Sequence, residues 1–159
     1  MIQDILSLLD TQIKFISWKP GKYDVVAPVW APTHKSNRYD QLPYVKAQDL
    51  PKSGKHIVCQ FDARSKGDKL PSEESIRQIV TKDMINVGDR LWDCDNRTGL
   101  SLLDKFKIIA SAKKYIGVDS GLTHLALMTN VPMVVLHKES WDAPFFYPKG
   151  QDIQFISLD

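Results

Sequence analysis

Between residue 55 and the end of the chain, short apolar runs alternate with segments of helical periodicity. In chain order, the expected elements are a strand at 56–61, a helix from Ser72, a strand at 84–87, a helix at 102–113, a strand at 115–118, a helix at 122–129 and a strand at 132–137. This alternation is typical of βαβ units, in which a helix crosses over between parallel strands. It therefore predicts an α/β fold, a Rossmann-like parallel sheet with helices on both faces.

Two of the expected helices have start signals. Ser72 is followed by Glu73 and Glu74, which are favourable at the positive end of a helix dipole. Ser101 is followed by Asp104, which imitates a capping box. The residues expected to face the core from these two helices are Ile76, Ile79, Val80, Leu102, Leu103, Phe106, Ile109 and Ala110.

The length of 159 residues predicts one domain, in which two zones differ in their sequence pattern. Residues 1–54 combine an expected helix at 2–13 and a strand at 14–18 with a proline-rich segment that has room for one more strand at 23–27. Residues 55–159 carry the regular α/β pattern. We expect the first zone to be a packed flap or an interaction segment.

Composition excludes several classes of protein. The chain is 43% hydrophobic and 25% charged, as expected of a globular protein, and its net charge of +2 gives no reason to expect nucleic-acid binding. No apolar stretch is long enough to span a membrane, and the N-terminus lacks a signal-peptide pattern. Cys59 and Cys94 are far apart in sequence without metal-ligand spacing, so we expect reduced thiols and a cytoplasmic location.

The segment GVDSGLTHLA, residues 117–126, is the sharpest functional motif, because it runs from a strand through a small-residue turn into a helix. Gly121 would let a ligand approach the backbone, and Ser120 and Thr123 offer hydroxyls and amides. His124 follows Ser120 by four residues, so the two can share a face and an imidazole there can donate to a phosphate. The alternative interpretation is purely structural: Ser120 caps the helix, Gly121 relieves crowding and His124 is a satisfied helix residue.

A family resemblance favours the functional interpretation. Residues 108–126 and 131–136 resemble the C-terminal half of the heptosyltransferase-like glycosyltransferases, family nine, which have the GT-B fold and a D-[ST]-G-x-x-H-L-A loop followed by a V-P-x-V-x-L strand. Residues 60–71 resemble the loop after the first strand of that family's donor-binding lobe, and 99–102 its G-x-[TS]-L helix start. The resemblance covers about residues 55–140, all within the donor-binding lobe.

The resemblance implies a nucleotide diphosphate-sugar as donor substrate, with no further cofactor and no metal. Its implied donor-site residues are Asp119, Ser120, Gly121 and His124, with Lys66 or Lys69 on the diphosphate and Thr123 in the same turn. A lysine neutralises phosphate as a point charge, whereas a carboxylate repels it. Asp119 would therefore bind backbone amides, hold His124 or meet a hydroxyl.

The catalytic residues stay unassigned. In the resembling family the acceptor lobe carries the carboxylate base, and this chain shows no such lobe. Asp24, Asp40, Asp49 and Asp62 are candidate bases by residue type alone. Three alternatives follow: an acceptor region built from residues 1–54, an acceptor lobe supplied by a second copy or a partner chain, or a non-catalytic nucleotide-sugar-binding or interaction module.

Weaker alternatives arise from the same residues. The G-V-D-S-G spacing fits a nucleophile elbow with Asp119 as nucleophile, which would need a later histidine such as His137. Asp119, His124 and His137 would be a metal site only with an unusual ligand spacing. The aromatic and proline residues of 140–148 are typical of an interface or a closing flap.

Asp89 falls near the position of the ribose contact in the resembling family, although a solvated turn residue is the simpler interpretation.

Overall fold

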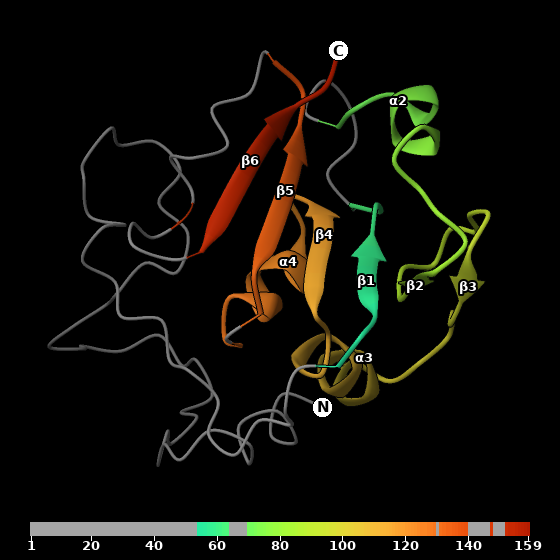
Figure 1. The fold of residues 1–159 in the computed structure, drawn as a ribbon, viewed down its shortest axis with the longest axis vertical. Helices are drawn as coiled ribbons and strands as arrows, with labels where there is room; N and C mark the ends of the chain where they lie inside the picture. The colour runs from blue at the N-terminus through green and yellow to red at the C-terminus, as the bar shows by residue number, and fades with distance from the viewer. Residues whose placement is uncertain (1–53, 64–69, 130, 140–146, 148–151) are drawn as a thin grey trace, which may run out of the picture.

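The computed structural model describes residues 54–63, 70–129, 131–139, 147 and 152–159 (Figure 1). Several sequence predictions lie outside these residues: the helix at 2–13, the strands at 14–18 and 23–27, Lys66 and Lys69, the candidate bases Asp24, Asp40 and Asp49, and all of the aromatic segment 140–148 except Tyr147.

The described residues form one parallel sheet of six strands in the order β3-β2-β1-β4-β5-β6. The strands are β1 (Ile57–Gln60), β2 (Met84–Asn86), β3 (Asp95–Asn96), β4 (Lys114–Val118), β5 (Met133–His137) and β6 (Ile153–Ser157). The chain builds one half of the sheet outward from β1 and the other half outward from β4. This is the doubly wound order of a Rossmann-like fold, so the predicted fold class is confirmed.

The helices are α2 (Glu73–Arg77), α3 (Leu102–Ala110) and α4 (Gly121–Ala126). Each begins after a serine whose Oγ accepts a hydrogen bond from the backbone N–H three residues later: Ser72 at 3.2 Å, Ser101 at 3.1 Å and Ser120 at 3.3 Å. The predicted caps at Ser72 and Ser101 are therefore confirmed. An N-cap serine contributes about 1 kcal/mol to stability, which matters most for helices this short.

Helices α3 and α4 end earlier than the sequence pattern predicts. The expected helices reached 113 and 129, whereas α3 ends at Ala110 and α4 at Ala126. Beyond each end, the backbone N–H donates to the carbonyl three residues earlier instead of four. These hydrogen bonds run from Ala112 N to Ile109 O at 3.0 Å and from Thr129 N to Ala126 O at 2.9 Å. These bonds tighten the chain into a turn, although the apolar spacing continues.

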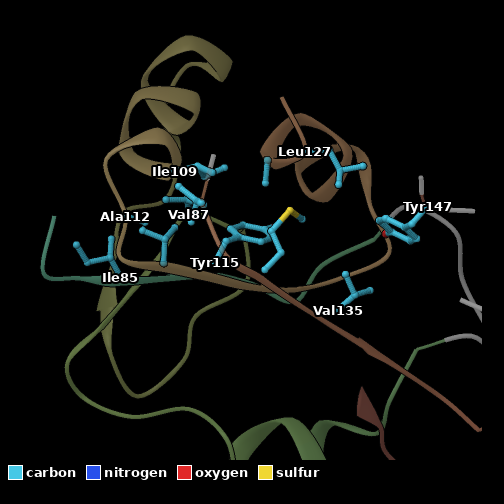
Figure 2. Packing of buried hydrophobic residues seen from close by; sticks show 12 residues of the cluster. Ile85, Val87, Ile109, Ala112, Tyr115, Leu127, Val135 and Tyr147 are labelled. Atoms are coloured by element: carbon cyan, nitrogen blue, oxygen red, sulfur yellow. The ribbon is translucent and has the colours of Figure 1, made fainter. Parts of the chain in front are cut away.

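Both faces of the sheet are covered, as predicted. Along β4, Tyr115 packs into one core and Ile116 into the other, because successive strand residues point to opposite faces. Figure 2 shows the first core, where Ile109 of α3 and Leu127 at the end of α4 lie over Tyr115. The second core contains Ile76 of α2.

The predicted inner faces of the helices are confirmed in part. Ile76, Phe106, Ile109 and Ala110 are buried, whereas Leu102, Leu103, Ile79 and Val80 are only partly buried. Ile79 and Val80 lie beyond the end of α2 and still pack against the second core.

Gly117 is required by the packing of its own strand. A Cβ at this position would lie 2.7 Å from the Oη atom of Tyr115 and 2.8 Å from its Cε1 atom, well inside van der Waals contact. Tyr115 and Gly117 are two residues apart and share one face of β4. Because the Tyr115 ring is fully buried, it has little room to move away.

We expect Gly117→Ala to lower the free energy of unfolding by about 1–3 kcal/mol, the usual cost of inserting a methyl group into a packed core. Urea unfolding measures this loss. Gly121→Ala is the matched control, because a Cβ at Gly121 has no neighbour within 4 Å in the part of the chain that the structure describes. Equal stability of the two variants would contradict this account of Gly117.

Candidate functional site

The candidate site lies where the strand order reverses, between the carboxyl ends of β1 and β4. These two strands are neighbours, with Gln60 in register with Gly117, and their arrowheads point to the same edge of the sheet (Figure 1). The chain leaves β1 through residues 61–63 and leaves β4 through Asp119 and Ser120 into α4. In doubly wound sheets, the crevice at such a reversal is where ligands bind.

The side-chain amide of Gln60 joins the ends of these two strands. Its Oε1 atom accepts hydrogen bonds from Ser120 Oγ at 2.7 Å and from Tyr115 Oη at 3.4 Å. Its Nε2 atom donates to the backbone carbonyl of Asp62. Gln60 is only 3% exposed, so its polar atoms depend on these partners.

Tyr115 and Thr123 continue this network beneath α4. The Tyr115 hydroxyl lies 3.1 Å from Thr123 Oγ1, which donates to the carbonyl of Val118 at 2.5 Å. Neither residue is exposed, and burial raises the pKa of Tyr115 far above its ordinary value. Thr123, expected among the binding residues, therefore supports the turn from beneath with its hydroxyl.

Asp119 and His124 pair on the other side of the turn. Asp119 Oδ1 lies 3.2 Å from His124 Nε2 and accepts a hydrogen bond from the Tyr147 hydroxyl at 2.9 Å. The imidazole stacks on the Tyr147 ring, with centroids 5.1 Å apart and planes 8° from parallel. Of the three partners expected for Asp119, the structure thus supplies two, the histidine and a hydroxyl.

The side chains of this turn have partners from different elements. The Ser120 hydroxyl donates to Gln60, and His124 pairs with Asp119. Tyr147 was not expected at the site. It lies in the aromatic segment near the end of the chain, and no spacing in the sequence links it to Asp119.

Gly121 is exposed at the start of α4, and an added Cβ there would meet no atom of the described residues within 4 Å. Crowding therefore does not explain this glycine, in contrast to Gly117. The conformation of Gly121 does not explain it either, because its φ is not positive. What the glycine provides is an uncovered backbone at the turn between Asp119 and α4.

Asp62 fixes the loop that follows β2. Its Oδ2 atom accepts hydrogen bonds from the backbone N–H groups of Asp89 at 2.6 Å and Arg90 at 3.1 Å. The side chain of Asp89 is 84% exposed and pairs with Lys105 at 3.1 Å. Asp89 is accordingly a solvated turn residue, whereas the Asp62 carboxylate is bound to the backbone of the loop after β2.

His137 and the titratable side chains bear on the nucleophile-elbow and metal-site alternatives. His137 directs its Nδ1 atom to the carbonyl of the adjacent Lys138, at 2.9 Å. In the part of the chain that the structure describes, no group of three or more His, Cys, Asp or Glu side chains is arranged to hold a metal ion. The helices of that part include none long and apolar enough to cross a membrane.

Comparisons of the chain with protein-family models, with curated proteins and with solved structures returned no match.

The Gln60 network is testable by stability. We expect Gln60→Leu to lower the free energy of unfolding by about 1–3 kcal/mol, because the buried Tyr115 hydroxyl and the partly buried Ser120 hydroxyl lose an acceptor. Urea unfolding measures the change, and Gln154→Leu on the exposed side of β6 is the matched control, expected within about 0.5 kcal/mol of wild type. A Gln60→Leu protein as stable as the control would show that the network is not required.

Proposed function

We propose that this protein binds a nucleotide diphosphate-sugar at the carboxyl ends of β1 and β4. The observation that carries the proposal is the open backbone at Gly121, located where the strand order of the sheet reverses. A Rossmann-like sheet binds nucleotides at this reversal. The motif at this position resembles the donor-site loop of heptosyltransferase-like glycosyltransferases, which supports the same ligand class.

Phosphate recognition is the proposed task of the turn into α4. Backbone N–H groups in the first turn of a helix lack intrahelical acceptors and favour anions. Ser120 Oγ accepts the hydrogen bond of the Thr123 N–H, and no side chain of the described residues covers the backbone at Gly121. The diphosphate is therefore assigned to the backbone around Gly121, with His124 as a side-chain donor.

The diphosphate of the proposed ligand is a dianion, and the nearby Asp119 carboxylate would repel it. Hydrogen bonding from Tyr147 and the contact with His124 offset the charge of this carboxylate. The loop that leaves β1 carries Lys66 and Lys69, and we assign one of these lysines to the diphosphate because the loop starts at the same edge of the sheet.

Sugar transfer to an acceptor is the further part of the proposal, and a non-catalytic binding module is its alternative. Transfer with inversion needs a base for the acceptor hydroxyl. The described carboxylates near the carboxyl ends of β1 and β4 all have partners. Asp119 is bound by Tyr147 and His124, and Asp62 accepts hydrogen bonds from backbone amides. Asp89 pairs with Lys105. This engagement favours a binding module unless residues 1–53, a second copy or a partner chain supplies the base.

A cytoplasmic location belongs to the same proposal. It rests on the two cysteines, which are unbridged in the fold.

Calorimetric titration with ADP, UDP, GDP and their sugars tests the binding step. We expect one nucleotide series to bind, and Gly121→Ala and His124→Ala each to weaken it at least about tenfold, equivalent to about 1.4 kcal/mol. Gly121→Ala should keep wild-type stability, which separates a lost contact from a lost fold. Lys69→Ala is compared with Lys82→Ala, an exposed lysine just before β2, at the opposite edge of the sheet.

Absence of binding by every nucleotide, or wild-type affinity in Gly121→Ala, would contradict the assigned site. Release of nucleoside diphosphate from the bound nucleotide-sugar, measured with and without candidate acceptors, then distinguishes a transferase from a binding module.

A further inference from the structure

Two arginine side chains from different elements share one carboxylate beside α2. Arg77 is the last residue of α2, and Arg90 lies in the loop after β2. Glu73, in the first turn of α2, pairs through Oε1 with Arg77 Nη2 and through Oε2 with Arg90 Nη2. We call these three side chains the arginine cluster. It combines two positive charges with one negative charge, so one positive charge is not compensated within it.

The indole of Trp92 supports both guanidinium groups. The Cζ atoms of Arg77 and Arg90 lie 5.9 Å and 5.1 Å from the centroid of this ring, within the range of a cation–π contact. Trp92 is buried and packs edge-on against Phe61, with ring centroids 5.4 Å apart and planes at 83°. Because the indole is fixed in the second core, it restricts both guanidinium groups before any ligand arrives.

The backbone that carries Arg90 is held on both sides. The Arg90 N–H donates to Asp62 Oδ2 at 3.1 Å, and the Arg90 carbonyl accepts a hydrogen bond from Asn86 Nδ2 at 2.6 Å. Asn86 is fully buried in β2, and Asp62 follows the end of β1. The position of Arg90 beside α2 is therefore set by the central strands of the sheet, not by the ion pair with Glu73.

The guanidinium groups are accessible to solvent. The side chains of Arg77 and Arg90 are 62% and 50% exposed, and that of Glu73 is 38% exposed. Ion pairs with this exposure contribute little to stability, because water screens them and ordering two long side chains costs entropy. An external anion can therefore take the place of the Glu73 carboxylate at little cost to the fold.

We propose that Arg77 and Arg90 bind the phosphate group of a small phosphorylated molecule, with Glu73 as an internal competitor for the same donors. A phosphate monoester carries a charge of about −1.5 to −2 at pH 7 and three acceptor oxygens. It matches two guanidinium groups better than the single charge and two oxygens of Glu73 do, and the planar fork of arginine suits phosphate oxygens.

This phosphate site is separate from the proposed nucleotide site. The arginine cluster lies between α2 and the loop after β2, whereas the diphosphate of the nucleotide is assigned to the turn between β4 and α4. The new proposal does not depend on the ligand of that turn.

An NMR titration of the ¹⁵N-labelled full chain with inorganic phosphate tests the proposal, with ionic strength held constant by chloride. We expect saturable shifts of the backbone amides of residues 73–77 and 89–92. The indole N–H of Trp92 is a further reporter, because it is buried and has no hydrogen-bond partner among the described residues. Phosphate bound at the turn into α4 would shift residues 119–124 instead, so the two sites are observed separately.

Charge variants identify the residues that bind. Glu73→Gln should tighten phosphate binding about fivefold or more, because it removes the competing charge and keeps the side-chain shape. Glu74→Gln is the matched control, since it removes the same charge from the next residue of α2, and its affinity should stay within about twofold of wild type. Arg90→Gln should abolish the saturable shifts. Its control is Arg97→Gln, an exposed arginine that pairs with Asp95 and should bind phosphate like the wild type.

Thermal unfolding establishes that each variant is folded before affinities are compared. Equal affinity of the Glu73→Gln and Glu74→Gln proteins, wild-type affinity in Arg90→Gln, or no saturable shift at residues 73–77 and 89–92 of the wild type would each overturn the proposal. If Glu73→Gln does not fold, the comparison of Arg90→Gln with Arg97→Gln decides the question. Loss of nucleotide binding in Gly121→Ala would leave these results unchanged, so the two proposals fail separately.

Discussion

The structure around the candidate site depends on one buried side chain, the amide of Gln60. It joins the end of β1 to the turn after β4 through Ser120 and to the first core through Tyr115. Because the Gln60 amide and the Tyr115 hydroxyl are shielded from water, the hydrogen bonds of this network fix the geometry of the turn more strictly than apolar packing would. Tyr115 in turn excludes any side chain at position 117, so the small residue that precedes the turn follows from the network.

The network also divides the motif into two kinds of residue. Ser120 and Thr123 face inward and hold the turn together, whereas Gly121 is exposed and Asp119 and His124 are paired at its rim. The motif at residues 117–126 therefore contains residues that stabilise the turn and residues that are candidates for ligand contact. The sequence alone does not distinguish the two groups, whereas the fold does. The docking of Tyr147 on Asp119 connects the end of the chain to this rim.

Sequence patterns predicted the parallel α/β architecture, four of the six strands and the serine caps, because each rests on local signals of periodicity or capping. Strand β3 has no such signal, since it consists of the two polar residues Asp95 and Asn96 paired to β2. Strand β6 has an apolar pattern but was not assigned. Tyr147 at the site was missed for another reason: its contacts with Asp119 and His124 join distant segments, which only tertiary packing determines.

The proposed binding surface lies at the carboxyl ends of the two central strands, β1 and β4. Hydrogen–deuterium exchange with and without a saturating nucleotide diphosphate-sugar tests it directly, because exchange reports local protection along the backbone. We expect slower exchange in peptides covering residues 57–63 and 117–127, and no change in β6. Protection confined to other segments, or none at saturation, would contradict the claim.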